Sequence, residues 1–282
     1  MAKPLAKLVA LITPKRRWAQ FSLATLLAVV TVLCLGLSVV VVPAERQRRA
    51  VAAIEALGGD VEYVEPDQGR FLQRWMPRDY FELVRSLDLG SVEDPDAGLA
   101  HLQGLTGLRV LSLACDRFPD AGLAHLQALT GLRELDLSFT QVTDTGLAHL
   151  QALTGLRKLI LFSTQVTDTG LAHLQALTGL QELYLGQTQV AVAGLAHLQG
   201  LTGLQVLYLD GTQVTDAGLE HLQELTALQT LHLGGTQVTD AGLAHLHGLT
   251  GLQWLDLVGT QVTDAGVPQL RQALPKCQIV GP

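Results

Sequence analysis

The 282-residue chain has few aromatic residues, few charges and few cysteines. Aromatic residues make up 5% of it, which excludes a core built on large rings, so the core must be aliphatic. Charged residues make up 16%, against about 25% in an average globular domain, while hydrophobic residues make up 48%. This balance excludes an intrinsically disordered chain, and three cysteines exclude a disulfide scaffold.

Basic residues are absent between Lys158 and Arg271, a stretch that holds nine Asp and Glu residues. The net charge of the whole chain is −7, which argues against a nucleic-acid partner. Residues 1–17, by contrast, carry five Lys and Arg residues and no acid. An acidic body behind a basic leader indicates two different environments.

Sequence signatures of catalysis are also missing. The chain contains no GxxxxGK[ST], no GxGxxG after a strand, no HExxH and no GxSxG. No spacing suggests a nucleophile next to a base. We therefore expect no enzyme and no cofactor; an enzyme or enzyme inhibitor is the least supported interpretation.

An uncharged run of 25 residues, Trp18–Val42, follows the leader. A transmembrane helix needs about 20 apolar residues, and Trp18 stands where an interfacial aromatic residue belongs. Pro43, which lacks an N–H, is expected to end the helix. A cleavable signal peptide is the alternative, but its apolar core is typically only about 7–15 residues long. An uncleaved anchor is therefore favoured.

The flanks of this run predict its orientation. Five Lys and Arg residues precede it, and Arg46, Arg48 and Arg49 follow it. Because the more basic flank stays in the cytoplasm, we expect a single-pass protein with a cytoplasmic N-terminus and an extracytoplasmic body.

The rest of the chain repeats itself every 24 residues. Seven histidines recur at this interval, and so do eight pairs of leucines such as Leu135/Leu137. In each unit, residues two apart form a short strand with one buried face, and leucines three apart follow in a short helical stretch. Such units, stacked as a right-handed coil, predict an α/β solenoid with a parallel sheet on its concave side and short helices on its convex side.

The strand signature L-x-x-L-x-L, as in Leu132-Leu135-Leu137, resembles that of the leucine-rich repeat family over about residues 84–282. The phrase Thr-Gln-Val-Thr-Asp-x-Gly-Leu is similar to bacterial members and to repeats that follow F-box motifs. Members often carry Asn in the turn after the strand, where its amide bonds neighbouring coils. This chain has threonines there, and a threonine ladder is expected to bond in the same way: Thr140, Thr164, Thr188, Thr212, Thr236 and Thr260.

Four segments follow from these observations. They are a basic cytoplasmic leader (1–17), a transmembrane helix (18–42), a juxtamembrane stalk and N-terminal cap (43–85), and eight repeats with a C-terminal cap (86–282). Within the stalk we expect a helix of about three turns that ends at Gly58-Gly59 and a short strand at 61–64. Trp75, Tyr80 and Phe81 supply bulk to the N-terminal cap, and Leu270, Leu274 and Ile279 point inward in the C-terminal one.

Two polar ladders accompany the repeats. The in-phase histidines lie along a line, whereas zinc needs three or four converging ligands; we interpret them as a helical position copied by duplication. An aspartate ladder lacks the calcium nonapeptide and is interpreted as helix capping; its members are Asp144, Asp168, Asp216, Asp240 and Asp264. No metal site is therefore expected.

One unit replaces Thr-Asp by Ala191-Val192. Its helix, Gly194–Leu201, should therefore be the least protected of the internal helical segments against hydrogen exchange.

Outward strand positions vary while the leucines stay the same. Period-2 alternation points these side chains away from the core, and they form an aromatic centre with acidic neighbours. Exposed aromatic residues on a sheet indicate an interaction patch; drift at free positions is the alternative. The candidate ligand-binding residues are Glu134, Asp136, Ile160, Glu182, Tyr184, Tyr208, His232, Trp254 and Asp256.

The resemblance, which extends to bacterial membrane-anchored members, implies binding of a macromolecule on the concave face and no catalysis. The expected function is a single-pass envelope protein whose solenoid binds another protein or an envelope polymer. A structural spacer without a specific ligand is the alternative.

Overall fold

The computed structural model describes residues 23–64, 83–92, 98–99, 101–102, 105, 107–116 and 118–281. The chain divides into two compact units, residues 1–46 and 47–282. The second unit contains the repeats. Trp75, Tyr80 and Phe81 of the expected N-terminal cap lie outside the described residues, as do the basic leader and residues 18–22. The segment boundary expected at residues 85 and 86 stays a prediction.

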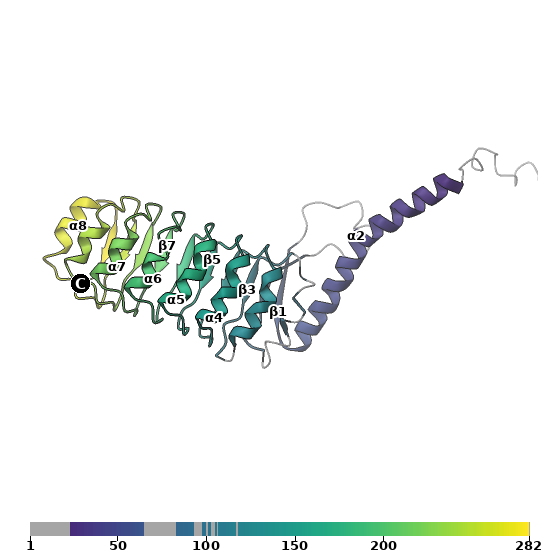
Figure 1. Ribbon diagram of the computed structural model, residues 1–282, viewed down its shortest axis with the longest axis horizontal. Helices are drawn as coiled ribbons and strands as arrows, with labels where there is room; N and C mark the ends of the chain where they lie inside the picture. Colours follow the sequence, from purple (N-terminus) through teal and green to yellow (C-terminus); the bar gives the residue numbers. More distant parts are fainter. Residues whose placement is uncertain are drawn as a thin grey trace, which may run out of the picture. The chain divides into compact units, whose positions relative to one another are not determined.

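One sheet runs through the second unit, with its strands in chain order from β1 to β10. β1 pairs antiparallel with β2, and every later neighbouring pair is parallel. Figure 1 shows the repeats stacked in sequence order, with their helices on one side of the sheet. The strands are β1 (Asp60–Val64), β2 (Leu83–Asp88), β3 (Val110–Ser112), β4 (Glu134–Asp136), β5 (Lys158–Ile160), β6 (Glu182–Tyr184), β7 (Val206–Tyr208), β8 (Thr230–His232), β9 (Trp254–Asp256) and β10 (Gln278–Val280).

The other side of each coil is helical, in short α and 3-10 pieces, because a 24-residue coil leaves room for little more. The α-helices are α4 (Asp144–Leu147), α5 (Asp168–Leu171), α6 (Val192–Ala196), α7 (Asp216–Leu219) and α8 (Val267–Ala273). The 3-10 helices are η4 (Asp120–Ala128), η5 (Ala148–Ala152), η6 (Ala172–Ala176), η7 (Glu220–Leu222) and η8 (Gly242–Leu246). The predicted solenoid of parallel strands and short helices is confirmed.

Columns of leucine form the core. In the repeat that begins at Thr130, Leu132, Leu135 and Leu137 are all buried. Leu135 pairs in register with Leu111 on one side and with Leu159 on the other. Each leucine therefore packs against its own copies in the neighbouring coils. At the C-terminal end Leu270 and Leu274 are buried and Ile279 packs against the core, as expected of a cap.

The turn after each strand uses the left-handed backbone region. Phe139, Ser163 and Gln187 have φ of 58°, 56° and 57°, and the equivalent residues of later repeats are glycines. The turn brings the following threonine back onto its own coil, where Thr140 Oγ1 donates to the Leu137 carbonyl at 2.7 Å. The prediction that the threonines bond neighbouring coils is therefore wrong. Backbone groups link the coils there instead; Phe139 N–H, for example, donates to the Phe162 carbonyl.

The aspartate ladder links coils rather than capping helices. Thr143 is the residue that caps α4, by accepting from Thr145 N–H at 3.3 Å. Asp120, one repeat earlier, accepts from the backbone N–H and hydroxyl of Thr143 at 2.7 and 2.5 Å. The same arrangement joins Asp144 to Thr167, Asp216 to Thr239 and Asp240 to Thr263. The interpretation of these aspartates as helix caps was wrong, because a carboxylate one residue past the cap reaches the next coil.

The in-phase histidines form a second ladder between coils. Gln127 Nε2 lies 2.8 Å from His149 Nδ1, and Gln151 Nε2 lies 2.7 Å from His173 Nδ1 one repeat later. Equivalent contacts reach His197, His221 and His245. A glutamine thus occupies one ring nitrogen of each of these histidines.

A long helix, α2 (Leu23–Ala56), precedes the sheet. Pro43 lies inside it, so the prediction that Pro43 ends the helix is wrong. A proline inside a helix costs about 3 kcal/mol, because a hydrogen bond is lost and its ring clashes with the preceding turn. The helix-favouring residues that follow, Ala44–Ala50, allow the helix to continue. The prediction of a helix of about three turns is wrong, because α2 has 34 residues. Its expected glycine end at Gly58-Gly59 is confirmed: Gly58 has φ of +91° and its N–H donates to the Glu55 carbonyl. Within the described part of the chain, no helix combines the length and apolar character needed to cross a membrane.

Candidate interaction surface on the sheet

All nine residues predicted to bind a ligand lie on strands β4 to β9. Each flanks a buried leucine, so the pleat turns it away from the core. Eight of the nine are half-buried, and Glu134 is exposed. We call the surface that they line the sheet face. Whether they bind a ligand stays a prediction.

Four rings on the sheet face form what we call the aromatic row: Tyr184, Tyr208, His232 and Trp254. The strand register places the first three side by side on β6, β7 and β8. Tyr184 and Tyr208 stack with centroids 4.5 Å apart, and Tyr208 and His232 stack at 3.9 Å with an angle of 9° between the planes. Trp254 continues the row at 6.5 Å from His232. Both faces of Tyr208 are therefore covered by other rings.

Lys158 and Glu182 adjoin the Tyr184 end of the row. Lys158 Nζ lies 5.4 Å from the Tyr184 ring centroid and 3.5 Å from Glu182 Oε2. The Tyr184 hydroxyl donates to Glu182 Oε2 at 3.1 Å. Burial, with the charge of Glu182 and this hydrogen bond, raises the pKa of Tyr184 well above its ordinary value. The phenol therefore stays a neutral hydrogen-bond donor.

The other end of the row is acidic. His232 Nδ1 lies 3.5 Å from Asp256 Oδ2 and 4.0 Å from Asp210 Oδ1. Burial, assisted by the charge of Asp256, raises the pKa of Asp210 against the opposing effects of His232 and of Gly234 N–H. Asp210 is not among the residues predicted from the sequence to bind a ligand. The sequence does distinguish it, because Asp210 is a charged residue at a position where every other repeat has an uncharged one. The equivalent residues are Gly90, Ala114, Ser138, Phe162, Gly186, Gly234 and Val258.

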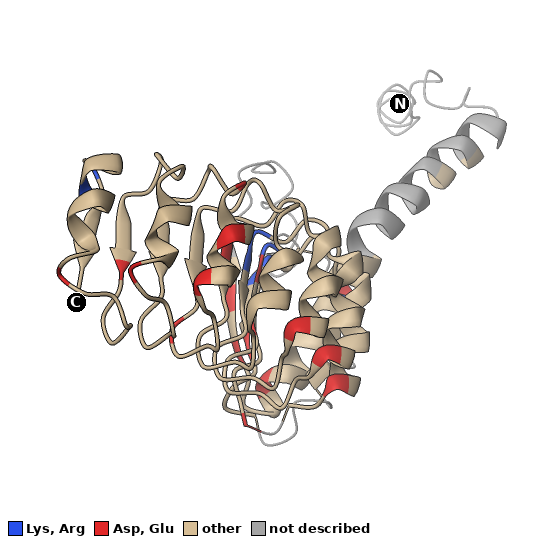
Figure 2. Ribbon diagram, turned by 60° about the vertical axis from the view of Figure 1, so that its left-hand side comes forward, with Lys and Arg blue, Asp and Glu red and all other residues tan. Residues whose placement is uncertain are grey.

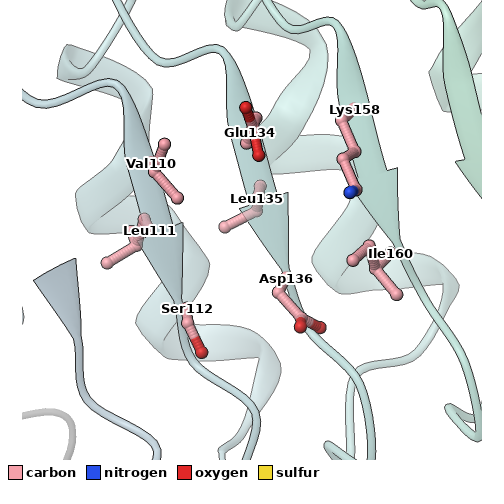
Figure 3. Close-up of a pocket in the computed structure, with 8 residues that line it drawn as sticks. All are labelled: Val110, Leu111, Ser112, Glu134, Leu135, Asp136, Lys158 and Ile160. Atoms are coloured by element: carbon pink, nitrogen blue, oxygen red, sulfur yellow. The ribbon is translucent and has the colours of Figure 1, made fainter. Parts of the chain in front are cut away.

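Glu134, Asp136 and Ile160 lie apart from the row, around an open hollow of about 230 Å³ on β3 to β5. Figure 3 shows Val110, Glu134 and Lys158 side by side across the three strands, with Ser112, Asp136 and Ile160 one pleat further along. Two carboxylates, four aliphatic side chains, the Ser112 hydroxyl and the Lys158 ammonium group thus share its lining.

Negative charge dominates the sheet face. Figure 2 shows acidic residues recurring along the repeats while Lys and Arg are few. Lys158 is the last basic residue before Arg271, so the row and its acidic end carry no Lys or Arg of their own beyond Lys158. The carboxylates are positioned to attract a cationic partner and to repel an anionic one.

This chain is similar to known leucine-rich repeat proteins. Two family models match, each described as leucine-rich repeat, over residues 202–262 and 128–150. Internalin C2 of Listeria monocytogenes is 30% identical, with a TM-score of 0.51, over 64% of this chain and 73% of its own. A leucine-rich repeat protein of Leptospira interrogans is 25% identical over 64% of this chain, with a TM-score of 0.54.

A second internalin of Listeria monocytogenes, 24% identical over 70% of this chain with a TM-score of 0.53, shares the fold. The chain spans 45% of the Leptospira protein and 60% of this internalin. The comparison with curated proteins gave no match.

Proposed function

We propose that this chain, which belongs to the leucine-rich repeat family, is a non-catalytic binding protein that holds a basic segment of another protein on its sheet face. The observation that carries this proposal is the aromatic row flanked by carboxylates in a stretch without Lys or Arg. Half-buried rings supply apolar contact area for an interface. The carboxylates supply long-range attraction and select against acidic partners.

The geometry of the rings narrows the kind of ligand. Stacking covers both faces of Tyr208, so a sugar ring has no free aromatic face there to lie on. An anionic envelope polymer would meet Glu182, Asp210 and Asp256 and be repelled. A polypeptide with Lys or Arg side chains avoids both difficulties, and this favours the protein partner over the envelope polymer.

Selection of peptides from a random-sequence display library on the full-length protein tests the proposal. We expect enriched peptides rich in Lys and Arg, with affinity that falls as salt rises because the attraction is screened. Binding should be lost in Tyr184→Ala with Tyr208→Ala. The control is Gln151→Ala with Gln175→Ala, which also replaces two side chains one repeat apart but on η5 and η6. Binding should persist in this control.

Two results of the peptide selection would contradict the proposal. Enrichment of acidic or uncharged peptides would overturn the basic partner. Peptides that bind the tyrosine double variant as well as the unchanged protein, or no enrichment at all, would leave the structural spacer as the better explanation.

Membrane anchoring is proposed separately, with a cytoplasmic N-terminus and an extracytoplasmic repeat unit. The uncharged run Trp18–Val42 and its more basic N-terminal flank support it. The full-length protein should then resist alkaline carbonate extraction, and protease outside intact cells should remove the repeats. A soluble product that begins near Glu45 would contradict an uncleaved anchor.

A further inference from the structure

We propose that Asp210, His232 and Asp256 form a site for one first-row divalent cation, of which zinc is the test case. The three side chains come from consecutive repeats, and one ligand atom from each lies within 4.8 Å of the others. Histidine nitrogen with two carboxylates is a donor set that suits zinc and its neighbours; calcium prefers six to eight oxygens. This site shares His232, Asp210 and Asp256 with the surface proposed to hold a basic segment, and the two proposals are tested by separate measurements.

The distances are close to those that coordination requires. Zinc binds histidine nitrogen and carboxylate oxygen at about 2.0–2.2 Å, so two ligand atoms on one tetrahedral ion lie about 3.5 Å apart. His232 Nδ1 and Asp256 Oδ2 are already 3.5 Å apart. His232 Nδ1 and Asp210 Oδ1 are 4.0 Å apart, and all three ligand atoms lie within 4.8 Å of one another, so the aspartate side chains must rotate toward the ion to complete the set.

Outer contacts hold the three ligands in place. The His232 ring is stacked on Tyr208 at 3.9 Å, which fixes its plane. Gly234 N–H donates to Asp210 Oδ1 at 3.1 Å, and Val258 N–H donates to Asp256 Oδ1 at 2.9 Å. Such outer partners orient metal ligands in known sites.

Gly234 leaves space for an ion beside the two carboxylates. A Cβ atom added to Gly234 would lie 2.8 Å from Asp210 Oδ1 and 3.8 Å from Asp256 Oδ2. The glycine therefore leaves room where the carboxylates approach one another. The equivalent residues Phe162 and Val258 fill that position in other repeats.

The charge balance points the same way. The side chains of Asp210, His232 and Asp256 are only 30%, 17% and 23% exposed. Two carboxylates held this close in a half-buried place repel each other. With no Lys or Arg between residues 158 and 271 in the sequence, a bound cation relieves this repulsion.

The test is a calorimetric titration of the full-length protein, made without a histidine tag and stripped of metal, with zinc alone at pH 7. We expect one zinc ion per chain, and a cobalt(II) complex whose visible spectrum shows ligation by nitrogen and oxygen. His232→Tyr is the main variant, because tyrosine occupies the same position in the two preceding repeats and keeps the stack. It should bind zinc at least about tenfold more weakly.

Two further variants separate the site from other histidines. Gly234→Ala should weaken zinc binding by filling the space, without removing a ligand. His173→Gln, in the histidine ladder of the helical side, should leave zinc binding unchanged. Zinc that binds His232→Tyr as tightly as the unchanged protein, or no stoichiometric zinc at all, would overturn the site. Neither result bears on the peptide selection, which needs no metal.

Discussion

The Asp168 carboxylate accepts a hydrogen bond from the backbone N–H of Ala191, one repeat later, at 2.6 Å, but the hydroxyl that its equivalents also bind is missing. One residue further, Val192 replaces the aspartate that would bind Thr215. Thr215 accordingly makes no side-chain cap hydrogen bond. The Asp–Thr ladder is therefore weakened at one junction between coils and interrupted at the next.

Restoring the ladder should stabilise the repeats. Ala191→Thr with Val192→Asp supplies a hydroxyl to Asp168 and a carboxylate to Thr215. A net hydrogen bond contributes about 0.5–1.5 kcal/mol, so we expect a gain of about 1–2 kcal/mol, read from the urea midpoint of unfolding. An unchanged midpoint would mean that Val190 and Val192 already compensate by burial.

Hydrogen exchange should report the same weakness locally. The stretch Gly194–Leu201 is expected to exchange faster than Gly170–Leu177. Solenoid units depend on their nearest neighbours, so a weaker junction should open first. Equal protection of the two stretches would contradict this expectation.

Two helical glycines should respond oppositely to alanine. A Cβ atom at Gly170 would lie 2.3 Å from Asp144 Oδ1, whereas at Gly218 the nearest atom is the flexible end of Leu195, at 3.1 Å. Gly170→Ala should therefore cost about 1–3 kcal/mol through overpacking. Gly218→Ala should be neutral or gain up to about 1 kcal/mol, since alanine favours helix.

A double-mutant cycle checks the reason for this difference. In a Val192→Asp background the new carboxylate should crowd Gly218 as Asp144 crowds Gly170. Gly218→Ala should then become destabilising, and additive unfolding free energies would refute the proposed contact.

The turn after the strand offers a test of backbone strain. Ser163 has φ of 56°, a conformation that costs a residue with a Cβ about 1–2 kcal/mol. Ser163→Gly should raise the free energy of unfolding by about 1 kcal/mol. Gly235→Ala should lower the free energy of unfolding by a similar amount, because φ is +66° there. The nearest atom to an added Cβ is 3.7 Å away, so no steric clash contributes.

Acid should weaken the Asp–Thr ladder. Burial would raise the pKa of Asp144, but hydrogen bonds from Thr167 and Thr169 outweigh it and hold the pKa below its ordinary value. A depressed folded-state pKa stabilises above the unfolded value of about 3.9 and loses this effect as pH falls through the folded value. Between pH 7 and pH 2, Thr167→Val with Thr169→Val should therefore lose less stability than the unchanged protein does. The exposed Thr226→Val serves as the control in the same urea titrations.

Sequence periodicity predicts the architecture because the leucine columns recur in phase. Leu135 and Leu137 share a face by period-2 alternation, and the structure buries both. The same alternation places Tyr184, Tyr208 and His232 in one row. Residues with equal offsets in a repeat must become neighbours, so this part of the site needs no structure to find.

Contacts between unlike offsets are harder to predict. Asp144 looks like a helix cap from its neighbours in sequence, and only the stacking of coils shows that it reaches Thr167. His232 and Asp210 have different offsets, so their approach depends on the rise between coils. The prediction that Pro43 ends the helix is wrong for another reason. The local cost of one proline does not decide whether a 34-residue helix continues.

The in-register pairing of Tyr184, Tyr208 and His232 also sets a measuring scale. Neighbouring strands lie about 4.8 Å apart. A polypeptide in the polyproline II conformation repeats every three residues with a rise of about 3.1 Å per residue, so one turn covers about 9 Å, close to two strand spacings. A partner held in this conformation would present every third side chain to every second repeat, and the side chains between would point elsewhere.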